Sequence, residues 1–148
     1  MRWLATGAAP VKIYILSYLA TAVVLLVCDI FWLTTTANTL YRPLLGDLLL
    51  EKFSLVPAVV FYVLYVAGVV FFAISPAIAS GRWTTALVYG ALFGFFAYAT
   101  YDLTNQTTLK SWPVTITVVD LCWGTVLTSV SATLGYIAAS ALVKATSA

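Results

Sequence analysis

Three aspartates, Asp29, Asp102 and Asp120, lie inside long apolar stretches of the chain. An aspartate at the centre of a membrane helix costs roughly 2.5–3.5 kcal/mol on insertion scales, so three of them in so short a chain need an explanation. No lysine or arginine lies at their depth to neutralise them. Carboxylates that lie close together in a low-dielectric interior cannot all ionise. The pattern therefore predicts a polar pocket that binds a proton, a cation or a small polar ligand. The alternatives are a set of protonated acids that hydrogen-bond to tyrosine, asparagine and threonine side chains and fix the register of the helices, or a site completed by another chain.

The composition is that of an integral membrane protein. Of the 148 residues, 63% are hydrophobic and only 8% are charged, and the mean hydropathy is +1.04. A soluble domain has about 25% charged residues. The net charge of +2 excludes a nucleic-acid binder, and the absence of histidine excludes imidazole catalysis and imidazole metal sites. Two cysteines make neither a zinc motif nor a disulfide framework.

Four apolar stretches are long enough to cross a bilayer, which takes about 20 helical residues. They span about residues 11–33, 57–78, 85–109 and 113–143. Pro57 and Pro113 stand where the second and fourth stretches begin, as is typical of a first helical turn. Ser75 and Pro76 are expected to close the second stretch. The sequence thus predicts an all-α, four-helix transmembrane bundle that forms one domain over residues 1–148.

The connection between the first two predicted helices is long. The first helix is expected to break at Thr34–Thr36, and an amphipathic segment follows in which Asp47 and Glu51 stand four residues apart. This spacing is typical of a helix that lies in the membrane interface. It predicts an interfacial helical segment, either as a structural cap over the bundle or as a lid over a site.

The aspartates are expected to meet at one depth. Each lies about seven residues, or roughly 10 Å, from the helix end on a single membrane face, because successive spans alternate in direction. Small residues share their helix faces, and Gly90-x-x-x-Gly94 has the spacing of a helix-packing motif. Tyr62 and Tyr65 lie at a similar depth on the second helix, where their hydroxyls are expected to donate to the carboxylates. The candidate binding residues are Asp29, Asp102, Asp120, Asn105, Tyr62, Tyr65 and Tyr98.

A short pattern occurs twice around the acids. Asp29-Ile-Phe-Trp32 and Asp120-Leu-Cys-Trp123 share Asp-x-x-Trp on helices of opposite direction. The pattern is either an inverted repeat or a coincidence, in which Trp32 belongs to an interfacial aromatic belt and Trp123 packs inside the bundle.

Several segments of the chain together carry a family resemblance. They are Asp29-x-x-Trp32, Pro57-Ala58-x-x-Phe61-Tyr62, residues 90–105, Thr108-Leu-Lys-x-Trp112 and Val119-Asp-x-x-Trp-Gly124. These segments resemble a family of small bacterial membrane proteins that is catalogued as a domain of unknown function (DUF2177-like). The resemblance covers roughly residues 11–143 and is most specific from Tyr98 to Asn105. It implies four helices and a bacterial membrane location, and it supplies neither an activity nor an assigned residue.

Three roles are open from the sequence. The first is a proton- or cation-binding bundle with a transport-like or sensing role, in which Asp102 and Asp120 are the main ligands. The second is an accessory or assembly subunit of a larger membrane complex. The third is a membrane enzyme acting on a lipid, with a divalent cation on the three carboxylates. The sequence favours a role that is not enzymatic. It names no cofactor, and a homodimer or a larger complex within the lipid bilayer remains open.

The basic residues give a weak orientation signal. Four of them share one predicted side and three share the other, which favours both termini in the cytoplasm of a bacterium, with the acids near the outer face of its inner membrane. The two groups are Arg2, Lys12, Arg82 and Lys144, and Arg42, Lys52 and Lys110.

Overall fold

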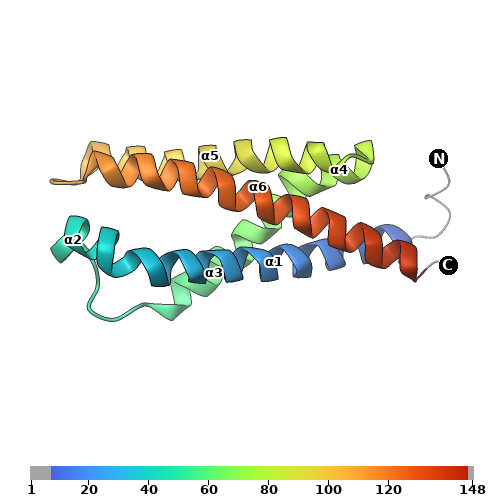
Figure 1. The fold of residues 1–148 in the computed structure, drawn as a ribbon, viewed down its shortest axis with the longest axis horizontal. Coiled ribbons are helices and arrows are strands. Elements are labelled where there is room, and N and C mark those ends of the chain that lie inside the picture. Colours follow the sequence, from blue (N-terminus) through green and yellow to red (C-terminus); the bar gives the residue numbers. More distant parts are fainter. Residues whose placement is uncertain (1–7, 147–148) are drawn as a thin grey trace.

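The computed structural model describes residues 8–146, with side chains described from Val11 onward. Within this range the chain forms four helical spans that are long and apolar enough to cross a membrane. They are Val11–Leu48, Leu55–Ser80, Trp83–Thr108 and Val114–Ala145. Figure 1 shows the ends of adjacent spans meeting at the two ends of an elongated bundle. The predicted all-α bundle is confirmed. Arg2, which weighs in the orientation argument, lies outside the described residues.

The first span does not break at the threonines. Helix α1 covers Ala8–Thr36 and continues through a π-helical turn, Ala37–Tyr41, into the short helix α2, Arg42–Leu45. The hydroxyls of Thr34 and Thr36 donate to the carbonyls of Phe31 and Trp32 at 2.9 and 2.7 Å. Threonine hydroxyls that bond to their own helix leave the backbone ladder intact, so the predicted break is wrong.

A short connection leads to the second span. A 3-10 turn, Gly46–Leu48, ends the helical path of the first span, and Glu51 lies beyond it in a bend. Asp47 and Glu51 therefore do not share one helix. The orientation of α2 relative to a membrane surface stays a prediction.

The second span bends rather than ends at its proline. Helix α3, Leu55–Val69, passes through a π-helical turn, Val70–Ile74, into α4, Ser75–Ser80. Proline lacks an N–H and its ring crowds the carbonyl four residues earlier, and a wider π turn before Pro76 relieves that conflict. The prediction that Ser75 and Pro76 close the helix is wrong. The span ends at Gly81, whose φ of 69° is left-handed.

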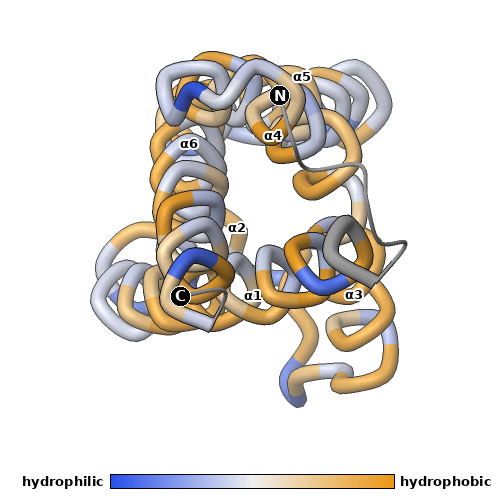
Figure 2. The backbone as a smooth tube through the Cα atoms, turned by 90° about the vertical axis from the view of Figure 1, so that its right-hand side faces the viewer, coloured by the Kyte–Doolittle hydropathy of each residue, from blue (hydrophilic) through white to orange (hydrophobic). Residues whose placement is uncertain are grey.

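The fourth span is the centre of the bundle. Helix α6, Val114–Ala145, packs along both α1 and α5, Trp83–Thr108. Figure 2 shows α6 running between these two neighbours. The α3–α4 segment crosses obliquely from the α1 side to the α5 side (Figure 1).

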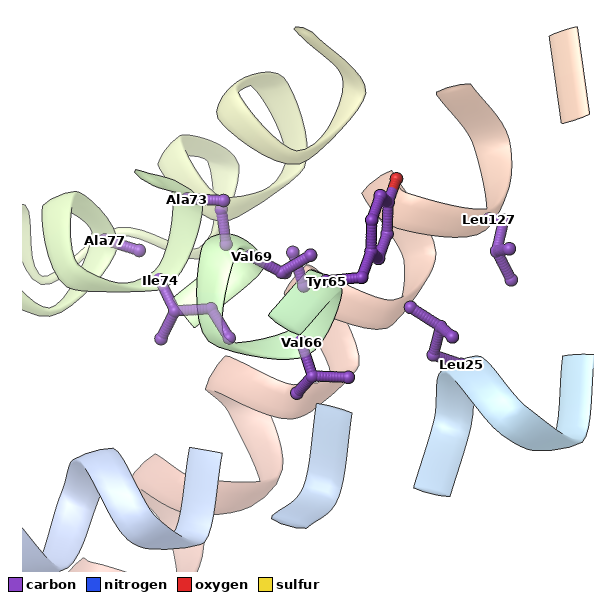
Figure 3. Close-up of a cluster of buried hydrophobic side chains, with 10 residues drawn as sticks. Leu25, Tyr65, Val66, Val69, Ala73, Ile74, Ala77 and Leu127 are labelled. Atoms are coloured by element: carbon purple, nitrogen blue, oxygen red, sulfur yellow. The ribbon is translucent and has the colours of Figure 1, made fainter. Parts of the chain in front are cut away.

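The apolar core lies where that oblique segment enters the bundle. Val66, Val69 and Ile74 are almost fully buried there. They pack in one cluster with Leu25 of α1 and Leu127 of α6 (Figure 3).

Glycines set the distance between α5 and α6. A Cβ atom on Gly94 would lie 2.2 Å from the carbonyl oxygen of Gly124, and one on Gly90 would lie 2.9 Å from the Cβ of Ala132. Gly90 and Gly94 thus form a helix-packing motif, as the sequence predicts. Close backbone approach is what stabilises helix pairs in lipid, where no hydrophobic effect drives them together.

We expect Gly94→Ala to lower the free energy of unfolding by roughly 1–3 kcal/mol, because backbone atoms of α6 must move away to admit the methyl group. Gly68→Ala is the matched control, since its new Cβ meets only the tip of the Phe93 ring. We expect the control to change stability by less than about 1 kcal/mol. Thermal unfolding in detergent measures both, and equal effects of the two variants would contradict this account of the α5–α6 contact.

Candidate functional site

The three aspartates lie in the half of the bundle where α5 ends and α6 begins. All three side chains are buried: Asp102 is 0% exposed, and Asp29 and Asp120 are each 8% exposed. Asp120 interacts electrostatically with both other carboxyl groups. Within the described part of the chain, however, no three acidic, cysteine or histidine side chains group closely enough to hold a metal ion.

Asp29 on α1 receives two donors from other helices. The Tyr62 hydroxyl of α3 donates to Asp29 Oδ2. The indole Nε1 of Trp123 on α6 donates to Oδ1 at 3.3 Å. Each oxygen of this carboxyl group therefore accepts one hydrogen bond, and the pair of bonds ties α1 to both α3 and α6. The predicted role of Tyr62 as a donor is confirmed by the geometry.

Asp120 on α6 is held by a residue that the sequence argument missed. The Tyr41 hydroxyl donates to Asp120 Oδ1 at 2.5 Å. Tyr41 in turn accepts a hydrogen bond from Trp32 Nε1 at 3.0 Å. Tyr41 ends the π turn after α1, in the predicted connection between the first two spans. Local spacing does not signal this contact, because nine residues place Tyr41 about 180° around a regular α-helix from Trp32, and the π turn changes that relation.

The two Asp-x-x-Trp patterns lie in contact, and the tryptophan of each one contributes to the hydrogen bonding of the aspartate in the other. The rings of Trp32 and Trp123 stack with centroids 4.3 Å apart and planes 9° from parallel. Trp123 bonds to Asp29 directly, while Trp32 reaches Asp120 through Tyr41. We call Trp32, Tyr41, Tyr62 and Trp123 the aromatic clasp. It supplies hydrogen-bond donors to two of the three buried acids and joins α1, α3 and α6.

Asp102 on α5 differs from the other two. Among the described residues, neither of its carboxyl oxygens has a hydrogen-bond partner, although the side chain is fully buried. One helical turn nearer the α5–α6 connection, Trp112 Nε1 donates to the hydroxyl of Thr117 at 3.1 Å, and that hydroxyl donates to Gln106 Oε1 at 3.1 Å. Asp102 thus lies just inside a polar chain at the end of the bundle.

The remaining candidates do not bond to the carboxyl groups. Tyr65 shares a hydrogen bond of 2.6 Å with Thr128, so its predicted role as a donor to an aspartate is wrong. Its position on α3 directs the hydroxyl to the hydroxyl-bearing face of α6. The ring of Tyr98 fills the space beside Gly124, where a Cβ would lie 2.1 Å from it. Asn105 pairs with Tyr101 one turn earlier on the same helix.

Two open grooves lie elsewhere on the bundle. One, of about 530 Å³, lies between α1 and the second span, and the other, of about 430 Å³, lies between the second span and α5. None of the three aspartates lines either groove. The first is lined by Tyr14, Ile15, Tyr18, Ala67, Val70, Phe71 and Ser75, and the second by Phe71, Phe72, Pro76, Tyr89, Leu92, Phe93 and Phe96.

The chain matches a known protein family. The sequence profile of the family described as "Predicted membrane protein (DUF2177)" matches residues 14–137, which include all three aspartates and the whole aromatic clasp. No curated protein matches the chain, and no solved structure matches it.

We expect Tyr41→Phe and Tyr62→Phe each to lower the free energy of unfolding by about 1.5–3 kcal/mol, because each removes a hydrogen bond to a buried carboxyl group. Tyr41→Phe should also alter the near-ultraviolet circular dichroism of the tryptophans, since Trp32 loses its acceptor.

Tyr89→Phe on the exposed face of α5 is the control for both measurements. If all three variants had the same free energy of unfolding and the same tryptophan signal, the aromatic clasp would not contribute to stability.

Proposed function

Since the chain belongs to the DUF2177 family of predicted membrane proteins, we propose that it acts in its membrane by binding and releasing a proton at Asp102. Asp29 and Asp120 frame this site, and the aromatic clasp holds them in place. A small cation in place of the proton is the competing ligand, and the experiment below separates the two.

The observation that carries the proposal is that the Asp102 carboxyl oxygens have no hydrogen-bond partner among the residues that the structure describes. A buried, ionised carboxyl group without hydrogen bonds or a counter-charge is strongly destabilising. Asp120 lies within electrostatic range and makes an additional negative charge at Asp102 less favourable still. Asp102 is therefore compatible with this fold when a proton or a cation neutralises it.

The surroundings of Asp102 support exchange with one membrane face. The Trp112–Thr117–Gln106 chain lies between the site and the α5–α6 connection, and Gln106 is exposed. Hydroxyl and amide groups at this position can hydrogen-bond water molecules, and such water can bring a proton to the carboxyl group. Apolar side chains at this position would instead separate the carboxyl group from water.

The cellular setting is part of the proposal. Lys12, Arg82 and Lys144 lie at the end of the bundle opposite the acids. Arg2 lies outside the described residues, and the sequence places it on the same side as a fourth positive charge. Arg42, Lys52 and Lys110 lie at the other end. By the positive-inside rule both termini then face the cytoplasm of a bacterium, and the acid layer lies near the outer face of its inner membrane.

The test is labelling with a hydrophobic carbodiimide, which reacts with protonated carboxyl groups in membranes. The protein is reconstituted in phosphatidylcholine vesicles, and mass spectrometry of its peptides locates the adduct. We expect Asp102 to be labelled, and the labelling to decrease as the pH is raised. Asp102→Asn should abolish this adduct, whereas Asp29→Asn and Asp120→Asn should retain it.

Salt distinguishes the two ligands. The labelling is repeated with sodium or magnesium ions at constant pH and ionic strength. If these ions protect Asp102 from the carbodiimide, the ligand is a cation and not a proton, whereas unchanged labelling supports the proton. An Asp102 that stays unlabelled at every pH in both salts would overturn the proposal.

Stability separates a binding site from a structural carboxyl group. We expect Asp102→Asn to leave the free energy of unfolding unchanged within about 1 kcal/mol, because it removes no hydrogen bond between described residues. Asp29→Asn is the comparison, since it weakens two bonds and should be clearly destabilising. A larger loss for Asp102→Asn than for Asp29→Asn would indicate a structural role for Asp102.

A further inference from the structure

Helices α1 and α6 carry buried hydroxyl groups that the proposed site does not use. Ser17 and Thr21 of α1 and Ser131 of α6 are each 0% exposed, and their hydroxyl oxygens have no hydrogen-bond partner among the described residues. Thr128 of α6 is also fully buried and bonds to Tyr65. We call Ser17, Thr21, Thr128 and Ser131 the hydroxyl seam.

The hydroxyl seam runs from the acid layer toward the opposite end of the bundle. Tyr65, which bonds to Thr128, lies within electrostatic range of Asp29. Ser17 is also buried on α1, roughly 18 Å from Asp29 along the helix axis. At the far end, Lys12 Nζ donates a hydrogen bond of 2.8 Å to the Thr146 hydroxyl. Buried hydroxyl groups thus lie on α1 and α6 between the acids and the opposite end of the bundle.

One of these hydroxyls lies in close contact with the backbone of α6. A Cβ atom on Gly135 of α6 would lie 2.0 Å from Thr21 Oγ1. Glycine is therefore required where the Thr21 hydroxyl projects from α1 toward α6. A seam needed only for close packing is equally well built from alanine and glycine, which bury no polar atom and carry no desolvation cost.

We propose that the hydroxyl seam binds internal water and conducts protons between the acid layer and the opposite membrane face. Buried polar atoms without protein partners are typical sites of internal water, and a water molecule there donates and accepts at once. A proton that arrives on one water releases another proton to the next oxygen, so no seam residue changes its covalent state. The inference rests on the proposed function, because Asp102 exchanges the proton at the acid end.

The experiment measures proton entry into phosphatidylcholine vesicles that contain the reconstituted protein and a trapped pH-sensitive dye. A potassium gradient with valinomycin makes the interior negative. We expect internal acidification at least about tenfold faster than in protein-free vesicles. Thr21→Val and Ser131→Ala should each reduce that excess rate at least about fivefold, because each removes a hydroxyl from the path.

Two variants serve as controls. Thr21→Ser keeps the hydroxyl and should retain most of the flux, which separates loss of the hydroxyl from loss of packing. Thr100→Val, on the exposed face of α5, should have no effect. Size-exclusion chromatography and thermal unfolding confirm that every variant is folded before its flux is compared.

Two results would overturn the inference. One is flux no faster than in protein-free vesicles, and the other is flux that Thr21→Val and Ser131→Ala leave unchanged. Carbodiimide labelling in the same vesicles identifies which proposal has failed. If Asp102 is labelled but no flux is seen, the proton path along the hydroxyl seam is wrong and the proposed proton site at Asp102 stands. If Asp102 is not labelled, the proposed function is wrong as well.

Discussion

Every buried carboxyl group in this bundle must be neutralised or bonded from within, because the hydrocarbon core of a bilayer offers neither water nor counter-ions. Asp29 and Asp120 meet this constraint through the aromatic clasp. Their donors come from α3, α6 and the turn that follows α1, so satisfying the two acids also fixes how three helices approach one another. Asp102 does not meet the constraint through any described residue, and the proposed site at Asp102 rests on this contrast.

The clasp depends on irregular backbone. A π-helical turn carries Tyr41 back over Asp120, and a second π turn before Pro76 bends the second span so that α3 contacts α1 while the following residues contact α5. A straight helix in either place would separate these groups. π-Helical turns are rare in general and frequent at functional sites. Here the first of them positions a hydroxyl donor on a buried acid.

Helix α6 connects the acid layer to the rest of the bundle. Its small residues admit α5 at Gly124 and α1 at Gly135, and the same face carries Asp120 and two hydroxyls of the seam. The small residues that allow close helix approach and the buried polar side chains therefore lie on one face of α6. Side chains that let helices pack tightly in lipid also bring their few polar atoms within reach of one another, which links stability to the proposed path for protons.

The sequence by itself determined the four spans, the burial of the acids and the packing role of Gly90 and Gly94, because these follow from hydropathy and from helical periodicity along one segment. It also identified Tyr62 as a donor. Only the tertiary structure decided which donors reach which acids: Tyr41 bonds to Asp120, Tyr65 turns to Thr128, and Asp102 is left without a partner. These outcomes depend on how far each helix continues and how it is rotated against its neighbours. Local spacing does not encode that rotation, since it is set by contacts between residues far apart in the chain.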